Sequence, residues 1–449
     1  MQRAFATALL VLMMCAAAAA AATPRGAVPP VLRIAVGTPL ESALAWGAAN
    51  GPHGASSAGV RVAPGDPEAI LVTIPPDGDG TYRAGWSVLA LDGHPIAGTT
   101  SFVVRSAYPV AHAVTPRGAD GIGPLGVLAR LLVLCGVLGT MGMALTRRWV
   151  LGVAWHSGGI WAPGEHDAAG VMERTARVAA GPVRVWWRTW WALAVTWGVG
   201  LVLGLIAQVS SLGISGGQVG TLLGETRWGI AWMVLAVLLA IAAVAATVAR
   251  RGELAMAPSS ARAVLMGAPG ALAAVVLAWA GHAGTGTDAT LGTALDALHG
   301  WATAVWLGGL VMLAVLAVPI IRRLDDHDAV HLGASVIVRF SALAVAAVVV
   351  LVVTGVYRAL AELPSLSALW TTSYGVVLLV KLGVFAGMLA LAAWNRFSLH
   401  PRVERAALGL GGDATGAMSA LRASVRAEIV LAAAVLVAVA VLVSIPPPV

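Results

Sequence analysis

Two histidines on either side of a short polar loop are the side chains in this sequence best suited to bind a metal ion. His282 closes one apolar stretch and His299 opens the next, so we expect both at the same end of neighbouring helices. Imidazole is the commonest metal ligand, and it suits copper, zinc and haem iron. Asp296, one helical turn before His299, could bind the ion or orient the imidazole. The alternative is two interfacial histidines with ordinary hydrogen bonds.

Three basic residues stand inside otherwise apolar stretches, where an ionisable group costs a few kcal/mol and therefore indicates function. They are Arg130, Arg358 and Lys381. Glu362 follows Arg358 by one helical turn and is its expected partner. Lys381 could instead extend its ammonium to the membrane interface without a functional role.

A second pair of histidines, His327 and His331, has the i,i+4 spacing of one helix face and stands among carboxylates. Such a pair could receive a metal ion. A solvated, charged turn is the alternative interpretation, and we keep both open.

The composition indicates which elements must position these groups. Hydrophobic residues make up 59% of the 449 residues and charged residues only 11%, against about 25% charged residues in soluble domains. A helix needs about 20 apolar residues to cross a bilayer. The sequence therefore predicts a mainly α membrane protein with an eight-helix transmembrane bundle, its spans near residues 124–145, 186–208, 228–249, 263–281, 297–321, 336–360, 373–396 and 427–445.

The chain before the bundle has a different character. Residues 1–22 have the basic start, apolar run and alanine tract of a signal peptide. Residues 23–107 are rich in Gly and Pro, with short alternating stretches that predict a small β-sandwich. Residues 108–123 read as a linker, and 124–445 as the transmembrane domain. The expected strands are 31–36, 69–74, 82–89 and 99–104.

Arginine distribution predicts the orientation of the bundle. Arginines gather in the loops 146–185, 250–262, 322–335 and 397–426, which the positive-inside rule places in the cytoplasm. The N-terminal domain is then extracytoplasmic, and both histidines of the first pair lie near the outer surface. Four tryptophans at the inner end of the second span, at positions 186, 187, 190 and 191, fit an interfacial belt.

Several functions are excluded by pattern. The basic residues stand between spans rather than in a basic arm, so we expect no nucleic-acid partner. No GxxxxGK[ST] loop and no nucleophile motif occurs, so we expect no use of ATP and no enzyme activity.

Two stretches resemble known families. The run Gly80–Gly98, with Asp92-Gly93-His94 near its end, resembles the C-terminal half of CopC, a family of periplasmic copper-binding β-sandwiches. The run His299-x6-Trp306-Leu307-Gly308-Gly309 resembles the CopD signature, and Thr354–Arg358 and Thr372–Gly375 with Lys381 fit the same family. The chain thus resembles a CopC–CopD fusion with a shortened CopC-like domain.

The resemblance implies copper transport or copper homeostasis and resistance at a bacterial inner membrane, with the lipid bilayer and a periplasmic copper chaperone as partners. It implies Asp92 and His94 as ligands of a copper ion. The N-terminal histidine that completes the CopC site has no counterpart after cleavage near Ala22, and His53 could replace it. A domain that retains only a docking or folding role is equally compatible with the sequence.

A haem- or quinone-binding membrane oxidoreductase or assembly factor is the alternative function. The cations Arg130, Arg358 and Lys381 favour it, because they repel a copper ion but suit haem propionates or a quinone oxygen.

Overall fold

The computed structural model describes residues 31–74, 78–105, 108–111, 123–156, 168–214, 216–251, 260–285, 288–407 and 414–445. The chain divides into two compact units. One contains the strands. The other contains the helices together with Asp92–His94, three of the four residues between the fifth and sixth strands. The expected signal peptide and most of the expected linker lie outside the described residues.

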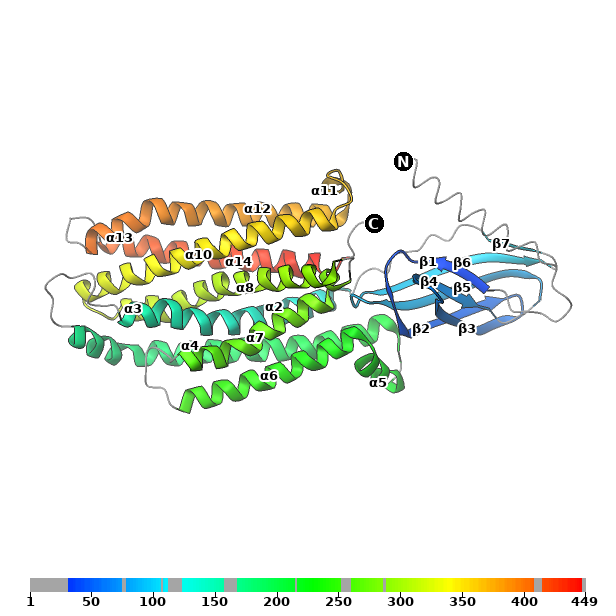
Figure 1. Ribbon diagram of the computed structural model, residues 1–449, viewed down its shortest axis with the longest axis horizontal. Coiled ribbons are helices and arrows are strands. Elements are labelled where there is room, and N and C mark those ends of the chain that lie inside the picture. Colours follow the sequence, from blue (N-terminus) through cyan, green and yellow to red (C-terminus); the bar gives the residue numbers. More distant parts are fainter. Residues whose placement is uncertain are drawn as a thin grey trace. The chain divides into compact units, whose positions relative to one another are not determined.

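The first unit is a curled antiparallel sheet whose described strands follow the order β1-β4-β3-β2-β5-β6-β7 (Figure 1). Alternating residues of these strands form its core, which includes Ile70, Tyr82, Trp86 and Phe102. The strands are β1 (Val31–Ala35), β2 (Leu40–Gly51), β3 (Gly54–Ala63), β4 (Asp66–Thr73), β5 (Gly80–Ala90), β6 (Pro95–Arg105) and β7 (Tyr108–Ala111).

The four strands expected from the sequence correspond to β1, β4, β5 and β6. No strand was expected at β2 or β3, whose residues are largely Ala, Gly and Ser. These residues have little intrinsic preference for strands, so pairing with β5 and β4 decides their conformation.

The second unit contains eight helices, among the described residues, that are long and apolar enough to cross a membrane. This confirms the expected number of spans. The helices are α2 (Gly123–Thr146), α4 (Ala168–Leu212), α6 (Arg227–Arg251), α7 (Ser260–Ala280), α8 (Ala289–Met312), α10 (Asp326–Glu362), α12 (Ser373–Trp394) and α14 (Ala414–Leu442).

Three spans continue as π-helical segments. They are η1 (Arg147–Gly152) after α2, η3 (Leu313–Ala317) after α8, and η4 (Asn395–Leu399) after α12. Short helices complete the unit: α3 (Val153–His156), α5 (Gly216–Glu225), α9 (Val318–Ile321), α11 (Ala368–Thr371) and α13 (His400–Ala407), with a 3₁₀ turn η2 (His282–Gly284).

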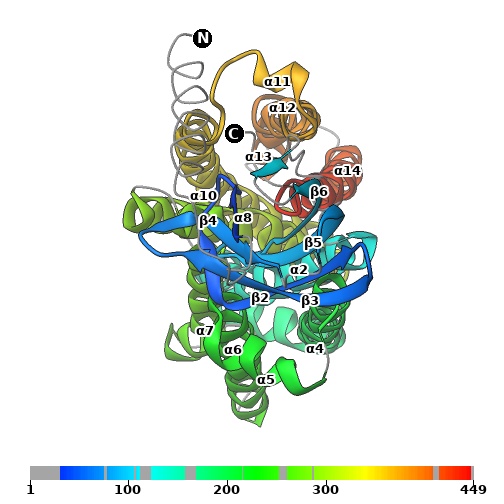
Figure 2. The ribbon, with the colours of Figure 1, turned by 90° about the vertical axis from the view of Figure 1, so that its right-hand side faces the viewer.

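Helices α2 and α8 lie in the middle of this unit. Seen end on, α4, α6 and α7 lie to one side of them and α10, α12 and α14 to the other (Figure 2). Gly142 of α2 and Gly308 of α8 allow the two central backbones to touch, because a Cβ on Gly142 would overlap the carbonyl oxygen of Ala304. The outer helices expose apolar side chains such as Val195 and Val353, as expected of surfaces that face lipid.

The expected interfacial tryptophan belt is wrong. Trp186 and Trp190 are buried in the core of the unit, with 1% and 0% of their surfaces exposed. The Trp190 indole donates a hydrogen bond to the Thr140 carbonyl, and the Arg147 guanidinium lies over the Trp186 ring. Packing of α4 against α2 therefore turns these side chains toward the interior of the helical unit.

Candidate metal centre

The turn Asp92–His94 presents two side chains that can bind a metal. Gly93 has φ +82°, a conformation that favours glycine, and it allows the sharp turn. An Asp92 carboxylate oxygen accepts the His94 backbone N–H at 3.1 Å, which fixes the turn. Gln208 Nε2 of α4 donates to the Gly93 carbonyl at 2.9 Å. The turn is therefore stabilised by its own Asp92 side chain and by Gln208 of α4.

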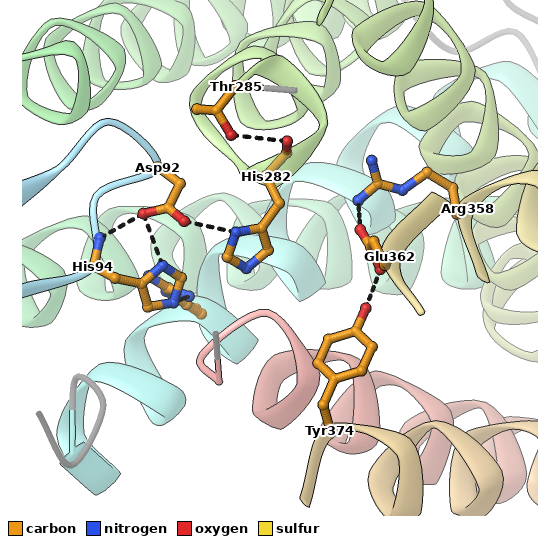
Figure 3. A network of polar contacts seen from close by, with 8 residues as sticks. Asp92, His94, His282, Thr285, Arg358, Glu362 and Tyr374 are labelled. Atoms are coloured by element: carbon orange, nitrogen blue, oxygen red, sulfur yellow. Dashed lines mark hydrogen bonds and ion pairs between the residues drawn. The ribbon is translucent and has the colours of Figure 1, made fainter. Parts of the chain in front are cut away.

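His282 meets this turn from the end of α7. The helix stops at Ala280, Gly281 is extended, and the chain enters the short turn η2 at His282. His282 Nδ1 lies 2.7 Å from Asp92 Oδ2 (Figure 3). The His282 and His94 rings stack 4.8 Å apart and nearly parallel, at 5°. His94 Nδ1 lies 3.1 Å from the other Asp92 oxygen.

Asp92, His94 and His282 form the group of metal-ligating residues found among the described residues. We call them the outer triad, after the face at which the arginine distribution of the sequence predicts them. One ligand atom of each lies within 4.8 Å of the others. His282 Nε2 is buried, and within the described part of the chain it has no hydrogen-bond partner. A buried polar atom without a partner costs free energy, so this nitrogen fits a site that accepts a ligand. A carboxylate and two imidazoles suit a first-row metal ion such as copper or zinc.

Electrostatics keeps two members of the outer triad deprotonated. Burial disfavours the charged carboxylate, but the two adjacent imidazoles outweigh it and hold the pKa of Asp92 well below its ordinary range. Burial lowers the pKa of His94, and the Arg130 guanidinium adds to this effect despite the opposing influence of Asp92. Metal ligands must be deprotonated, so both groups are ready to bind.

Arg130 stands beside the outer triad. Its Nη1 on α2 lies 3.4 Å from His94 Nε2. Arg130, one of the three cations singled out within the apolar stretches, is thus a close neighbour of the candidate ligands. A cation at this distance weakens the attraction of the triad for a metal ion.

The other two cations belong to a second polar network, formed by α8, α10 and α12. Arg358 donates a hydrogen bond to Glu362, as expected from their spacing, and lies 3.6 Å from Asp296. Tyr374 donates to the same Glu362 carboxylate (Figure 3). Lys381 interacts electrostatically with Asp296 and Glu362. Two cations thus face two carboxylates, and their attraction offsets part of the cost of taking these charges out of water.

Local sequence explains the position of this network. Thr372 caps α12 by accepting the Gly375 N–H at 3.0 Å, so Tyr374 occupies the first turn of the helix. The helix α10 ends at Glu362, two residues before Pro364. Capping and termination together bring Tyr374 and Glu362 to adjacent helix ends.

His299 lies outside the outer triad, although the sequence paired it with His282. Its Nδ1 is 2.8 Å from the Thr354 hydroxyl of α10. Asp296, on the same helix, interacts electrostatically with His282 as well as with Arg358 and Lys381. Asp296 pairs with Arg358 and so belongs to the second network, whereas His299 faces α10.

The remaining candidates lie elsewhere. His53 lies beside Gly78 in the strand unit, and His331 is partly buried on α10. The side chain of His327 lies outside the described residues. None of these joins the group of metal-ligating residues found in the described chain.

Comparisons with known proteins match both units. Residues 334–442 match the family described as Copper resistance protein D, CopD, and residues 38–105 match the CopC domain. These two matches, in this order along the chain, support a CopC/CopD fusion family. Asp92 and His94 lie within the CopC match, and Arg358, Glu362 and Tyr374 lie within the CopD match. His282 and Asp296 lie outside both.

Two curated relatives of this CopC/CopD chain carry similar descriptions. It is 27% identical over 374 residues to the copper transport protein CutJ of Bacillus subtilis (strain 168). The aligned region covers 82% of this chain and 61% of the relative. It is 32% identical over 216 residues to copper resistance protein D of Pseudomonas syringae pv. tomato. That aligned region covers 47% of this chain and 66% of the relative. The chain thus spans less than two thirds of each relative. No solved structure matches it.

Sequence reasoning missed one residue that shapes the CopC/CopD site. Gln208 is buried at the end of α4 and holds Gly93. Its signal was present, since a buried amide in an apolar span is costly without a partner.

Neither the matched families nor the relatives' names mention haem or quinone.

Proposed function

We propose that this chain is a copper transport or resistance protein of a bacterial inner membrane, and that the outer triad accepts the copper ion at the extracytoplasmic face. The observation that carries the proposal is the meeting of the CopC turn residues Asp92 and His94 with His282. Cleavage of the expected signal peptide near Ala22 would leave the CopC site of the family pattern one ligand short. His282, whose Nδ1 lies 2.7 Å from Asp92 Oδ2, would supply the third ligand.

The arrangement supports transfer as well as capture. Arg130, 3.4 Å from His94, limits how tightly the triad holds a cation, which favours release. Asp296 interacts with His282 and lies one turn before His299. His299 uses Nδ1 for Thr354, so its Nε2 is the nitrogen that would take the ion next. The route then passes from the outer triad to His299 on α8.

The chemistry needs no covalent step. The family names, Copper resistance protein D and CopC, suggest a non-enzymatic role. The three ligands of the triad bind the copper ion and release it unchanged. The ion then moves down its own gradient or is coupled to the gradient of another ion. A periplasmic copper carrier is the partner that would load the triad.

Copper binding by the purified full-length chain tests the proposal. We expect about one copper ion per chain in the wild type and in His53→Ala, and loss of that ion in His282→Ala. His53 is the matched control, because it is the other histidine that could have completed the CopC site. Retention of full copper by His282→Ala together with its loss from His53→Ala would overturn the triad.

A further inference from the structure

A cavity of about 430 Å³ lies between α10 and the segment that continues α12, away from the outer triad. The apolar side chains of Val338, Ala342 and Val345 line it from α10, and Arg396 and His400 line it from η4 and α13. Because α10 and α12 run in opposite directions, Arg396 and His400 lie level with the first half of α10. Val345 is farther toward the middle of the span. The cavity therefore has Arg396 and His400 at one end, and its wall along α10 is apolar apart from Ser341.

The π-helical segment η4 directs the two polar side chains to this cavity. Asn395, its first residue, donates to Glu428 and accepts a hydrogen bond from Ser424 at 2.7 Å, both on α14. These bonds fix one side of η4 against α14. Arg396 and His400 both line the cavity on the α10 side. Such π-helical turns often occur at functional sites.

His400 carries a polar atom without a partner. The side chain is 9% exposed, and its buried Nδ1 has no hydrogen-bond partner within the described part of the chain. Arg396 is exposed and interacts electrostatically with His400. An arginine next to an unsatisfied imidazole favours an anion that can accept hydrogen bonds from both.

The surroundings indicate an anion with an apolar tail. Val338 and Val345 are 38% and 55% exposed on the lipid-facing side of α10, and Trp394 and Phe397 are exposed beside Arg396. Exposed aromatic residues next to a basic side chain are typical of the membrane–water interface. Arg402 and Arg405 follow at the same end of the bundle, where anionic headgroups are attracted.

We propose that this cavity binds one phospholipid with a net negative headgroup, its phosphate on Arg396 and His400 and an acyl chain along Val338, Ala342 and Val345. The lipid would fill the space between α10 and the end of α12 and so hold the two helices together. The site is distinct from the outer triad, which lies at the opposite ends of the helices.

Lipid binding to the purified full-length chain in detergent tests this. Native mass spectrometry and thermal unfolding are recorded with phosphatidylglycerol, phosphatidylcholine or inorganic phosphate added. We expect one phosphatidylglycerol per chain and a rise in Tm with that lipid alone. Arg396→Gln and His400→Gln should each weaken its binding about tenfold, the effect of losing one charge-assisted hydrogen bond. Arg402→Gln, an arginine at the same end that does not line the cavity, is the matched control.

A filling variant separates binding from folding. Ala342→Phe places a ring in the apolar part of the cavity and should exclude the lipid while leaving copper binding at the outer triad unchanged. Equal binding of phosphatidylcholine, binding of inorganic phosphate with no preference for lipid, or unchanged phosphatidylglycerol binding in Arg396→Gln, His400→Gln and Ala342→Phe would each overturn the proposal.

Discussion

Asp92 is the residue at which the proposed copper site is most easily tested. It accepts the His94 backbone N–H and lies against His282 Nδ1 at 2.7 Å, so it shapes the turn and joins the two imidazoles. Asp92→Asn keeps an oxygen for the His94 N–H, and the turn should persist. The substitution removes the negative charge and a ligand oxygen. Outer-shell changes alone cost 10- to 100-fold in metal affinity, so loss of a ligand should raise the copper Kd about 100-fold or more.

The assay is a chelator competition titration of the purified chain, with Asp66→Asn as the matched control. Asp66 also pairs with a basic side chain, Arg33, but both are solvent-exposed members of the strand unit. We expect Asp66→Asn to bind copper as the wild type does. A copper Kd for Asp92→Asn within threefold of the wild-type value would refute the assignment of Asp92 as a ligand.

Three further predictions follow from the same contacts. Arg130→Gln should tighten copper binding about tenfold in the same titration, because it removes a cation 3.4 Å from His94; weaker binding would contradict the proposed release role. Glu362→Ala leaves the largely buried Arg358 without its main partner and should lower the free energy of unfolding by about 3 kcal/mol. Asp66→Asn, which breaks an exposed ion pair, should lower it by at most about 1 kcal/mol. Equal losses in the two variants would contradict this prediction. The pKa of His94 is lowered in the folded chain, so the unfolded chain binds the extra proton and stability should fall as pH drops below about 6.5, by up to about 1.4 kcal/mol per pH unit. Thermal unfolding at pH 7.5 and 5.5 should show this loss in the wild type and a smaller one in His94→Gln, and an identical loss in both would contradict it.

The helical part of the fold could be predicted because its signal is strong. Eight apolar stretches of membrane-spanning length permit few alternatives to helices in lipid. The pairing of Arg358 with Glu362 was equally accessible, because four residues along a helix fix two side chains on one face. Strands β2 and β3 could not be predicted, since their small residues carry no clear alternation and depend on their neighbours.

The residues of the candidate site were named from the sequence, but their grouping was not. Asp92, His94 and His282 were all candidates, yet Asp92 and His282 are separated by 190 positions in the chain. No local pattern reports a contact of that kind. His299 was paired with His282 because their helices are neighbours, whereas the direction of each side chain sends His299 to Thr354. The direction of the His282 side chain depends on where α7 ends, at Ala280 before the extended Gly281. The spacing of apolar residues does not indicate that point.

The central claim, that His282 completes the copper site of the CopC turn, is tested most directly by X-ray absorption spectroscopy of the copper-loaded full-length chain. The structure predicts two imidazole ligands in the wild type, one in His282→Ala and one in His94→Ala. His53→Ala should retain two. An imidazole count unchanged by His282→Ala but reduced by His53→Ala would contradict the account.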